Sequence, residues 1–296
     1  MARNNIVKKL ILGSAQFGEK YGVNNSYASL SKRESFKILK FAKSSGINTI
    51  DLAEKYKSYK NIFNIYKLNR WKVSLKVSYD QVKHINEEKF NYYFFQNLQY
   101  LNKQKIEYLI IHNPSILKKN KGRLFFNNLK KLKKKKLIEK IGVSVYDPGE
   151  FLKILKNFTI DVVQLPLSIF DQRFCSSGLI KKINAKKIEV HARSIFLQGL
   201  LISNKKNLKK KYFKNNVLLN QWFGYIKNNK KDAIFECLKF VIKKRFVKKI
   251  VFGVNKLDHF KEIIKKLNLN YKTQSLDKFR AHDIKLIDPR KWKKIK

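Results

Sequence analysis

Short runs of apolar residues alternate with longer amphipathic stretches along almost the whole chain. Most of these runs are continuous, which is typical of strands buried on both faces of a parallel sheet, whereas a half-exposed strand alternates apolar and polar residues. They predict eight strands, at residues 10–15, 48–52, 72–77, 108–112, 140–145, 162–167, 188–192 and 248–253.

The stretches between these runs have the pattern of helices. In the first of them, Ser31 and Glu34 have the spacing of a capping box, apolar residues recur every third position, and Gly46 closes the segment. Similar patterns predict helices at residues 88–101, 123–136, 148–156, 178–186, 231–244 and 258–267.

Eight strands that alternate with helices favour a closed (β/α)8 TIM barrel over an open doubly wound sheet. The absence of a GxGxxG segment also argues against a Rossmann domain. No linker divides the chain, so residues 1–296 are expected to form a single α/β domain. One long connection, at about 203–229, follows the seventh strand, and we expect its Trp222 and Phe223 to pack a helix within it.

Composition excludes several classes of protein. Hydrophobic residues make up 44% of the sequence, enough for a large core. No apolar run approaches the roughly 20 residues of a membrane span, and the N-terminus lacks an apolar signal segment, so we expect a cytoplasmic protein with no membrane partner. Cys175 and Cys237 have the spacing of neither metal ligands nor a disulfide framework, so we expect two ordinary thiols and no metal site.

The formal net charge of +46 raises the question of nucleic-acid binding. The lysines, however, are spread over almost every predicted helix and do not form one basic tail. Runs such as residues 130–136 are therefore interpreted as solvated helix faces whose long side chains cover apolar surface. We expect no specific nucleic-acid partner, although a basic nucleic-acid-binding protein remains an alternative hypothesis.

Four titratable residues lie where predicted strands end. Asp51 ends the second strand, Lys76 the third and His112 the fourth, and Tyr56 lies in the loop that leaves the second. Each alone has an ordinary structural explanation, such as a helix cap, a solvent-facing amine or a packed ring. Because function in a (β/α)8 barrel collects at the carboxyl ends of the strands, the four together predict an active site.

The sequence around these residues resembles the aldo-keto reductases, in the branch with Ala-Arg-Ser at the end of the seventh strand. The resemblance covers roughly residues 7–268. Its segments are GINTIDLAEKY at 46–56, SLK at 74–76, LIIHNP at 109–114, IGVS at 141–144, VQ at 163–164 and ARSIFLQGLL at 192–201.

The resemblance implies a catalytic role for each of the four residues. Tyr56 would donate the proton in the reduction of a carbonyl. A free phenol has a pKa near 10, about three units above neutral pH, so it needs a neighbouring cation to release its proton. Lys76 would supply that cation, Asp51 would hold it in place, and His112 would orient the carbonyl oxygen.

The resemblance also implies a nicotinamide cofactor, NADP(H). Ser144 and Gln164 would bind its carboxamide, and Arg193 stands where many relatives have a ring that stacks on the nicotinamide. Leu197, Gln198 and Gly199 would border the pyrophosphate through backbone groups. The adenosine phosphate would lie against Gly253, Asn255, Lys256 and His259, of which Lys256 and His259 are cations suited to a 2′-phosphate.

Some positions depart from the family pattern. Leu52 stands for a usual Thr, Lys57 for a usual Gly, Val145 for an Asn at the carboxamide and Ile263 for an Asn at the adenine, while Lys60 stands near a usual Glu. None is one of the four catalytic positions. They affect how tightly the cofactor is expected to bind and the choice between NADP and NAD.

The sequence thus favours an NAD(P)H-dependent oxidoreductase that reduces the aldehyde or ketone group of a small molecule, such as a sugar or hydroxy-aldehyde. Phe17, Tyr21, Ser78 and Asn113 are expected near the substrate. A second hypothesis is a dinucleotide-binding sensor or accessory module with low turnover. The sequence carries no signal for an oligomeric state.

Overall fold

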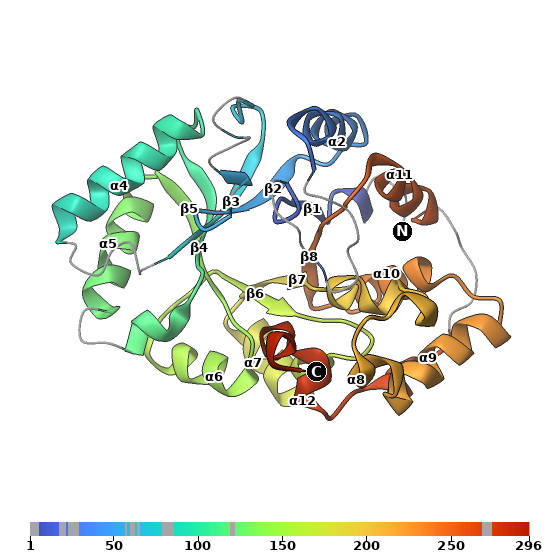
Figure 1. The fold of residues 1–296 in the computed structure, drawn as a ribbon. Helices are drawn as coiled ribbons and strands as arrows, with labels where there is room; N and C mark the ends of the chain where they lie inside the picture. The colour runs from blue at the N-terminus through green and yellow to red at the C-terminus, as the bar shows by residue number, and fades with distance from the viewer. Residues whose placement is uncertain are drawn as a thin grey trace.

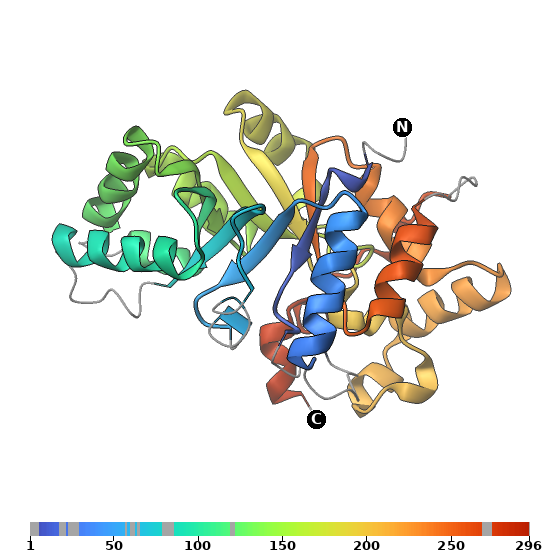
Figure 2. The ribbon, with the colours of Figure 1, turned by 90° about the horizontal axis from the view of Figure 1, so that it is seen from above.

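The computed structural model describes residues 6–17, 22, 30–56, 58–59, 63, 66–78, 86–118, 122–267 and 274–295. Within them, eight parallel strands form a closed barrel in which each strand pairs with its neighbours in sequence and the last pairs with the first. Figure 1 shows this barrel surrounded by helices, and Figure 2 shows the same arrangement from above. The strands are β1 (Leu10–Gly13), β2 (Thr49–Ala53), β3 (Lys72–Val77), β4 (Ile106–Ile111), β5 (Ile138–Ser144), β6 (Val162–Pro166), β7 (Glu189–Arg193) and β8 (Val247–Phe252).

The helices lie outside the strands. The longer ones are α2 (Lys32–Ser44), α4 (Glu87–Tyr100), α5 (Gly122–Lys134), α6 (Pro148–Asn157), α7 (Ser177–Ala185), α9 (Val217–Asn228), α10 (Ala233–Ile242) and α11 (Leu257–Lys266). Several begin at a side chain that accepts a hydrogen bond from the third backbone N–H of the helix, as an N-cap does. These N-caps are Ser31, Asn86, Asp147, Asn216 and Asp232.

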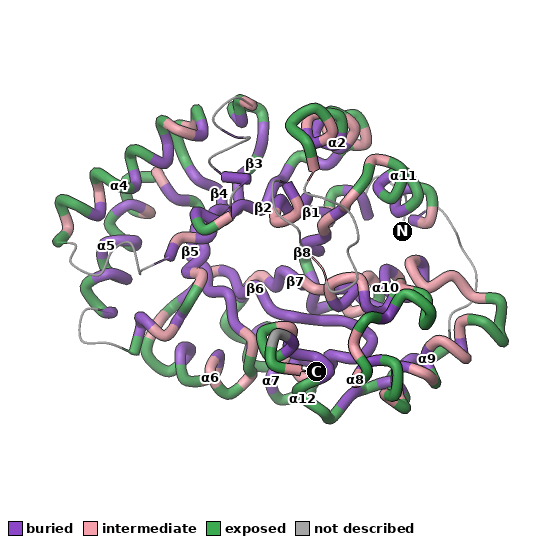
Figure 3. The backbone as a smooth tube through the Cα atoms, viewed as in Figure 1, coloured by how far each residue is buried: buried purple, intermediate pink, exposed green. Residues whose placement is uncertain are grey.

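The strands are buried almost throughout, which explains their continuous apolar sequences. Every residue of β1, β2, β4 and β6 is buried, and Figure 3 shows the buried colour concentrated along the strands. Each amphipathic helix turns its apolar face toward this barrel and its lysines toward solvent. The predicted single-domain (β/α)8 barrel, with its eight strands and the helices named from the sequence, is therefore confirmed.

The long connection after β7 is packed against the barrel. It contains η4 (Leu197–Ile202), η5 (Lys205–Asn207), α8 (Lys211–Lys214) and α9. Trp222 of α9 is fully buried and donates a hydrogen bond from Nε1 to the carbonyl oxygen of Leu201, 2.8 Å away. The expectation that Trp222 packs a helix within this connection is confirmed.

The C-terminal segment lies against the loops that follow the strands. It includes α12 (Ile284–Ile287) and η7 (Pro289–Lys294), drawn in red in Figure 1. The backbone N–H of Ala281 donates to Phe170, which follows β6, and the ring of Trp292 contacts Phe213 of α8, with centroids 5.1 Å apart. These contacts place the end of the chain at the carboxyl ends of the strands.

Two expectations from composition can be compared with the described residues. Cys175 and Cys237 are both free thiols. Among the helices of the described ranges, none combines the length and the apolar character needed to cross a membrane.

Candidate functional site

All four predicted catalytic residues line one cavity at the carboxyl ends of the strands. Asp51 lies in β2, Lys76 in β3, and His112 directly after β4, where its backbone N–H donates to Val77. Tyr56 lies in the turn after β2. The cavity has a volume of about 490 Å³. The parallel strands end at the same rim, so residues 61 positions apart in sequence meet there.

Asp51 is the hydrogen-bonding centre of this rim. Its carboxylate is buried and forms an ion pair with Lys76. It also accepts hydrogen bonds on Oδ2 from Ser74 Oγ at 3.0 Å and from Gln164 Nε2 at 2.8 Å. Gln164 belongs to β6, so this bond crosses the interior of the barrel. A buried carboxylate with one cationic partner and two further donors is held in a fixed orientation.

Lys76 is charged in this setting although it is buried. Burial alone would lower the pKa of its amine, but the Asp51 carboxylate and the Tyr56 hydroxyl outweigh that effect, so the pKa lies above its ordinary value. The ammonium nitrogen lies 5.1 Å from the centroid of the Tyr56 ring. The cation that the sequence predicts beside the phenol is therefore in place.

His112 stands on the other side of Tyr56. The two ring centroids are 6.2 Å apart and the rings are nearly perpendicular, at 86°. Burial, with a further contribution from the Lys76 charge, lowers the pKa of His112 to about 4. The imidazole is therefore neutral near pH 7, with one N–H that can donate a hydrogen bond.

A second buried network holds the segment that carries Tyr56. The backbone N–H of Tyr56 donates to Ala53 at 2.9 Å, which closes a turn directly after β2. Glu54, which follows Ala53 in this turn, accepts hydrogen bonds from Ser78 N at 3.1 Å and from Asn97 Nδ2 at 3.0 Å. Burial raises the pKa of Glu54, which these two donors partly offset. The turn is thus tied to the end of β3 and to α4.

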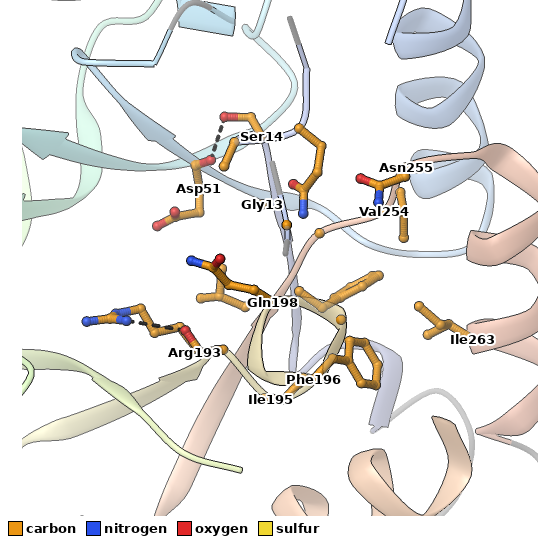
Figure 4. Close-up of a pocket in the computed structure, with 18 of the residues that line it drawn as sticks. Gly13, Ser14, Asp51, Arg193, Ile195, Phe196, Gln198, Val254, Asn255 and Ile263 are labelled. Atoms are coloured by element: carbon orange, nitrogen blue, oxygen red, sulfur yellow. Dashed lines mark hydrogen bonds between the residues drawn. The ribbon is translucent and has the colours of Figure 1, made fainter. Parts of the chain in front are cut away.

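The cavity extends from this rim past the loop that follows β7. Figure 4 shows Asp51 and Arg193 at one end and Asn255 and Ile263 at the other. Between them, Ser194, Leu197 and Gln198 have positive φ angles of 58°, 48° and 53°, and Gly199 has a φ of 88°. Non-glycine residues rarely adopt such angles, so the loop holds a strained shape that bends its backbone around the cavity.

Buried amide oxygens line the same elongated space. Gln164 Oε1, Asn255 Oδ1 and Gln16 Oε1 are buried and have no hydrogen-bond partner among the described residues. The side-chain amide of Gln16 packs directly on Gly253, where any Cβ atom would overlap it. Buried polar atoms without partners are costly, so these three oxygens are available to accept hydrogen bonds from a polar ligand in this space.

The first turn of α11 borders the far end of the cavity. Its N-cap residue, Lys256, has extended backbone angles, and the Lys256 side chain does not cap the helix. A helix N-terminus with open N–H groups favours anions such as phosphate. His259, in the first turn of the helix, lines the cavity beside Glu262 and Ile263.

Most of the residues singled out from the sequence line this one cavity. These are Asp51, Tyr56, Lys76, His112, Ser144, Gln164, Arg193, Gln198, Gly199, Gly253, Asn255 and His259. Leu197 is 1% exposed, packs into the core and is not among the residues that line the cavity. Lys256 is exposed and lies outside the lining.

The residues expected near the substrate that the structure describes do not line the cavity. Phe17 is fully buried in the core, and Ser78 is buried and donates its backbone N–H to Glu54, so neither side chain faces the cavity. Asn113 is exposed and accepts a hydrogen bond from Ser115 N at 3.1 Å. Tyr21, Lys57 and Lys60 lie outside the described residues.

Other lining residues were missed in the sequence. Gln16 and Ser14 follow β1, and the position of that strand end was a signal for both. Ser74 was missed because only its place two residues before Lys76, on the same face of β3, marks it. Tyr146 lines the cavity beside Arg193, and no sequence pattern indicated this pair.

Comparisons with known proteins were made for both sequence and structure. The sequence model of the aldo/keto reductase family matches residues 9–284. No curated protein sequence matches the chain. The structure is similar to the holo form of the aldo-keto reductase AKR11C1 from Bacillus halodurans, with a TM-score of 0.69 at 15% identity over 92% of this chain and 90% of that one. It is also similar to the glycerol dehydrogenase AKR11B4 from Gluconobacter oxydans, with a TM-score of 0.66 at 18% identity over 91% and 89%.

Proposed function

The chain belongs to the aldo/keto reductase family, whose members are oxidoreductases that act on carbonyl groups, and from that premise we propose that it reduces an aldehyde or ketone with NADPH, using Tyr56 as the proton donor. The observation that carries the proposal is the buried Asp51–Lys76 ion pair, whose ammonium lies beside the Tyr56 phenol in the cavity at the carboxyl ends of the strands.

The residues of the rim fit the proton-transfer half of the reaction. Reduction adds a hydride to the carbonyl carbon and a proton to the carbonyl oxygen, and a bound nicotinamide supplies the hydride. Tyr56 donates its hydroxyl proton to the oxygen as negative charge develops there. Lys76 stabilises the phenolate that remains, and Asp51 keeps the ammonium directed at it. Neutral His112 donates a hydrogen bond that orients the carbonyl.

The rest of the cavity has the groups that a dinucleotide needs. The free Oε1 of Gln164 is an acceptor for the N–H of a carboxamide, and Ser144 lies beside it on β5, paired in register with Gln164. The positive-φ loop of Gln198 and Gly199, with the Leu197 backbone, borders the pyrophosphate. The adenosine phosphate would lie against the segment of Gly253, where the Gln16 amide packs, and Asn255 presents its Oδ1 to the adenosine.

We propose NADP as the preferred dinucleotide. A 2′-phosphate would lie near the open N-terminus of α11, where His259 lines the cavity and Lys256 stands at the N-cap. Both the helix terminus and the cations stabilise an added phosphate. Ile263 lines the same end and offers only an apolar surface to the adenine.

The test is a titration of the purified protein with NADPH and NADH, followed by nicotinamide fluorescence. We expect saturable binding with a lower Kd for NADPH at moderate and at high salt, and oxidation of the bound NADPH when a reactive aldehyde is added. Equal affinities would remove the NADP assignment. Tight binding without any oxidation would point to the dinucleotide sensor, and no binding at all would remove the proposed reductase function.

A further inference from the structure

An aromatic ring beside the active site is held between two guanidinium groups. The Cζ atom of Arg193 lies 4.0 Å from the ring centroid of Tyr146, and the Cζ atom of Arg290 lies 3.7 Å from the same centroid. Two groups this close to one centroid fit only on opposite faces, so the ring lies between them. Such stacking fixes a long arginine side chain in one orientation.

The two arginines differ in what neutralises them. Arg290, in η7, donates to both carboxylate oxygens of the buried Asp288, at 2.9 and 2.6 Å. Arg193, the last residue of β7, donates to two neutral acceptors, the backbone oxygen of Val145 at 3.0 Å and Ser194 Oγ at 3.3 Å. Within the described ranges, no carboxylate forms an ion pair with Arg193. A guanidinium has five N–H donors, so most of its binding capacity is unused.

Arg193 lines the cavity on the side of the chemistry. Figure 4 shows its side chain extending away from Gln198, on the side of the cavity where Asp51 lies. Its charge is among the causes that lower the pKa of His112, after burial and Lys76. The positive charge of Arg193 therefore affects the part of the cavity where the proposed substrate carbonyl would lie, beside His112.

The charges at this end of the cavity do not balance. Asp51 and Lys76 neutralise one another as an ion pair, and His112, with a pKa of about 4, is uncharged at neutral pH. The Arg193 charge acts on the buried Asp171, but that carboxylate is itself held by Arg173 through hydrogen bonds of 2.8 and 2.7 Å. Among the residues that line this end, Arg193 thus contributes an excess positive charge. Lys55 adds a second cation, but it is exposed and water screens it.

We propose that Arg193 binds an oxyanion, a carboxylate or a phosphate, on the carbonyl substrate, and that the enzyme therefore prefers acidic aldehydes or ketones to neutral ones. This inference rests on the proposed reductase function. A fixed planar guanidinium with free N–H donors matches the geometry of both oxyanions. It also gives Arg193 a different role from stacking on the nicotinamide, since its planar group already stacks on Tyr146.

The test compares two pairs of substrates that differ in charge: 4-oxobutanoate against its methyl ester, and glyceraldehyde 3-phosphate against glyceraldehyde. We expect wild type to have a higher kcat/KM for at least one anion than for its neutral partner, by about tenfold or more, as loss of a charge-assisted hydrogen-bond pair implies. Whichever pair shows the preference identifies the oxyanion.

In Arg193→Gln the ratio of anionic to neutral kcat/KM should fall by about tenfold or more, and Arg193→Lys should restore part of it. The matched control is Lys182→Gln, which removes one exposed charge on α7 and should leave the ratio unchanged. A wild-type ratio near one in both pairs would overturn the inference while leaving the reductase function intact. No reduction of any of the four compounds would instead contradict the proposed function.

Two further measurements keep the test decisive. If Arg193→Gln weakens NADPH binding and leaves the substrate ratio unchanged, Arg193 belongs to the cofactor site and the inference is wrong. If the variant does not fold, wild type alone answers the question through inhibition. Succinate, which has no carbonyl to reduce, should compete with a neutral aldehyde, whereas succinamide at the same concentration should not. Equal inhibition by both would contradict an oxyanion site.

Discussion

At the scale of single residues, Asp51 determines the shape of the site. Its carboxylate binds Lys76 and accepts hydrogen bonds from Ser74 and Gln164, so side chains from β3 and β6 are directed by one group on β2. The Ser14 hydroxyl donates to the backbone oxygen of the same residue at 2.9 Å. Removing this carboxylate would leave several buried polar atoms without partners, which lowers the stability of the fold.

Tyr56 and Lys76 are expected to act as one unit. Lys76→Met removes the cation that stabilises the phenolate, and Tyr56→Phe removes the phenol itself, so each variant should lose most of the contribution of the pair. The double variant should then be little slower than the worse single variant, because residues that act together are lost together. Single-turnover rates with bound NADPH measure this coupling.

The control for this cycle is Ser74→Ala, which removes one hydrogen bond from a neutral hydroxyl to Asp51 and keeps the ammonium. Its loss of rate should be much smaller than that of Lys76→Met. Strictly additive losses in the double variant would show that Lys76 and Tyr56 act independently and would contradict the proposed role of Lys76.

His112 links the site to the pH dependence of stability. Its pKa is lowered to about 4 in the folded protein, mainly by burial and then by Lys76, from an ordinary value of 6.5. The folded state therefore disfavours the protonated form. This contribution to stability is fully present above about pH 6.5 and is lost as the pH falls toward 4, where the unfolded chain binds the proton first.

We predict that His112→Gln reduces the acid sensitivity of the fold. Between pH 6.5 and 4 the free energy of unfolding of wild type should fall further than that of the variant, by up to about 3 kcal/mol for a shift of this size. Urea unfolding of both proteins across this range gives the difference directly. If the free energies of unfolding of the two proteins fall in parallel, protonation of His112 does not destabilise the fold.

The sequence predicted the residues of the site better than it predicted their contacts. Asp51, Lys76 and His112 could be found because strand ends in a barrel share one rim. The bond from Gln164 to Asp51 could not, because residues 113 positions apart meet only after the barrel closes and the rotamers are chosen. Phe17, which we expected near the substrate, lies in the core, since a loop residue that follows a strand can turn inward.

At the scale of secondary-structure elements, continuous apolar runs located all eight strands to within a few residues, because burial on both faces leaves no polar positions. The prediction for β1 continued to residue 15, but the strand ends at Gly13, where Ser14 turns to bond Asp51. The shape of the loop after β7 was not predictable, because its positive φ angles are stabilised by contacts outside the local sequence.

This loop gives a prediction about Gly199. Its φ of 88° suits glycine, and a Cβ there would meet no atom within 4 Å, so Gly199→Ala tests backbone strain alone. The substitution should cost about 1 kcal/mol or more of stability and should weaken NADPH binding, because the loop would relax away from the cofactor. Thermal unfolding and fluorescence titration measure the two effects.

Gly178→Ala is the matched control, since it also adds a Cβ into open space but within α7. Because alanine is favoured over glycine in helices, this variant should gain up to about 1 kcal/mol and should bind NADPH as wild type does. If Gly199→Ala behaves like Gly178→Ala in both assays, the conformation of the loop has no part in cofactor binding.

At the scale of the whole molecule, the net charge of +46 surrounds a barrel of ordinary architecture. Several lysines pair with the few acids, as Lys131 does with Glu87 and Lys133 with Asp161, both at 2.6 Å. We predict that duplex DNA binds weakly and without sequence preference, and that binding is lost at about 200 mM salt, because it would rest on phosphate contacts alone. Sequence-specific binding that survives this salt concentration would support the nucleic-acid hypothesis.

The central claim is that Tyr56 donates the proton in carbonyl reduction. Tyr56→Phe removes the phenolic oxygen and keeps the ring, so the fold and NADPH binding should be preserved. Single-turnover reduction of a reactive aldehyde by bound NADPH should become slower by at least about 10², as loss of a general acid predicts. Tyr92→Phe, on the exposed face of α4, is the matched control and should react at the wild-type rate. A Tyr56→Phe enzyme that also reacts at nearly the wild-type rate would show that the proton comes from another group and would contradict the account.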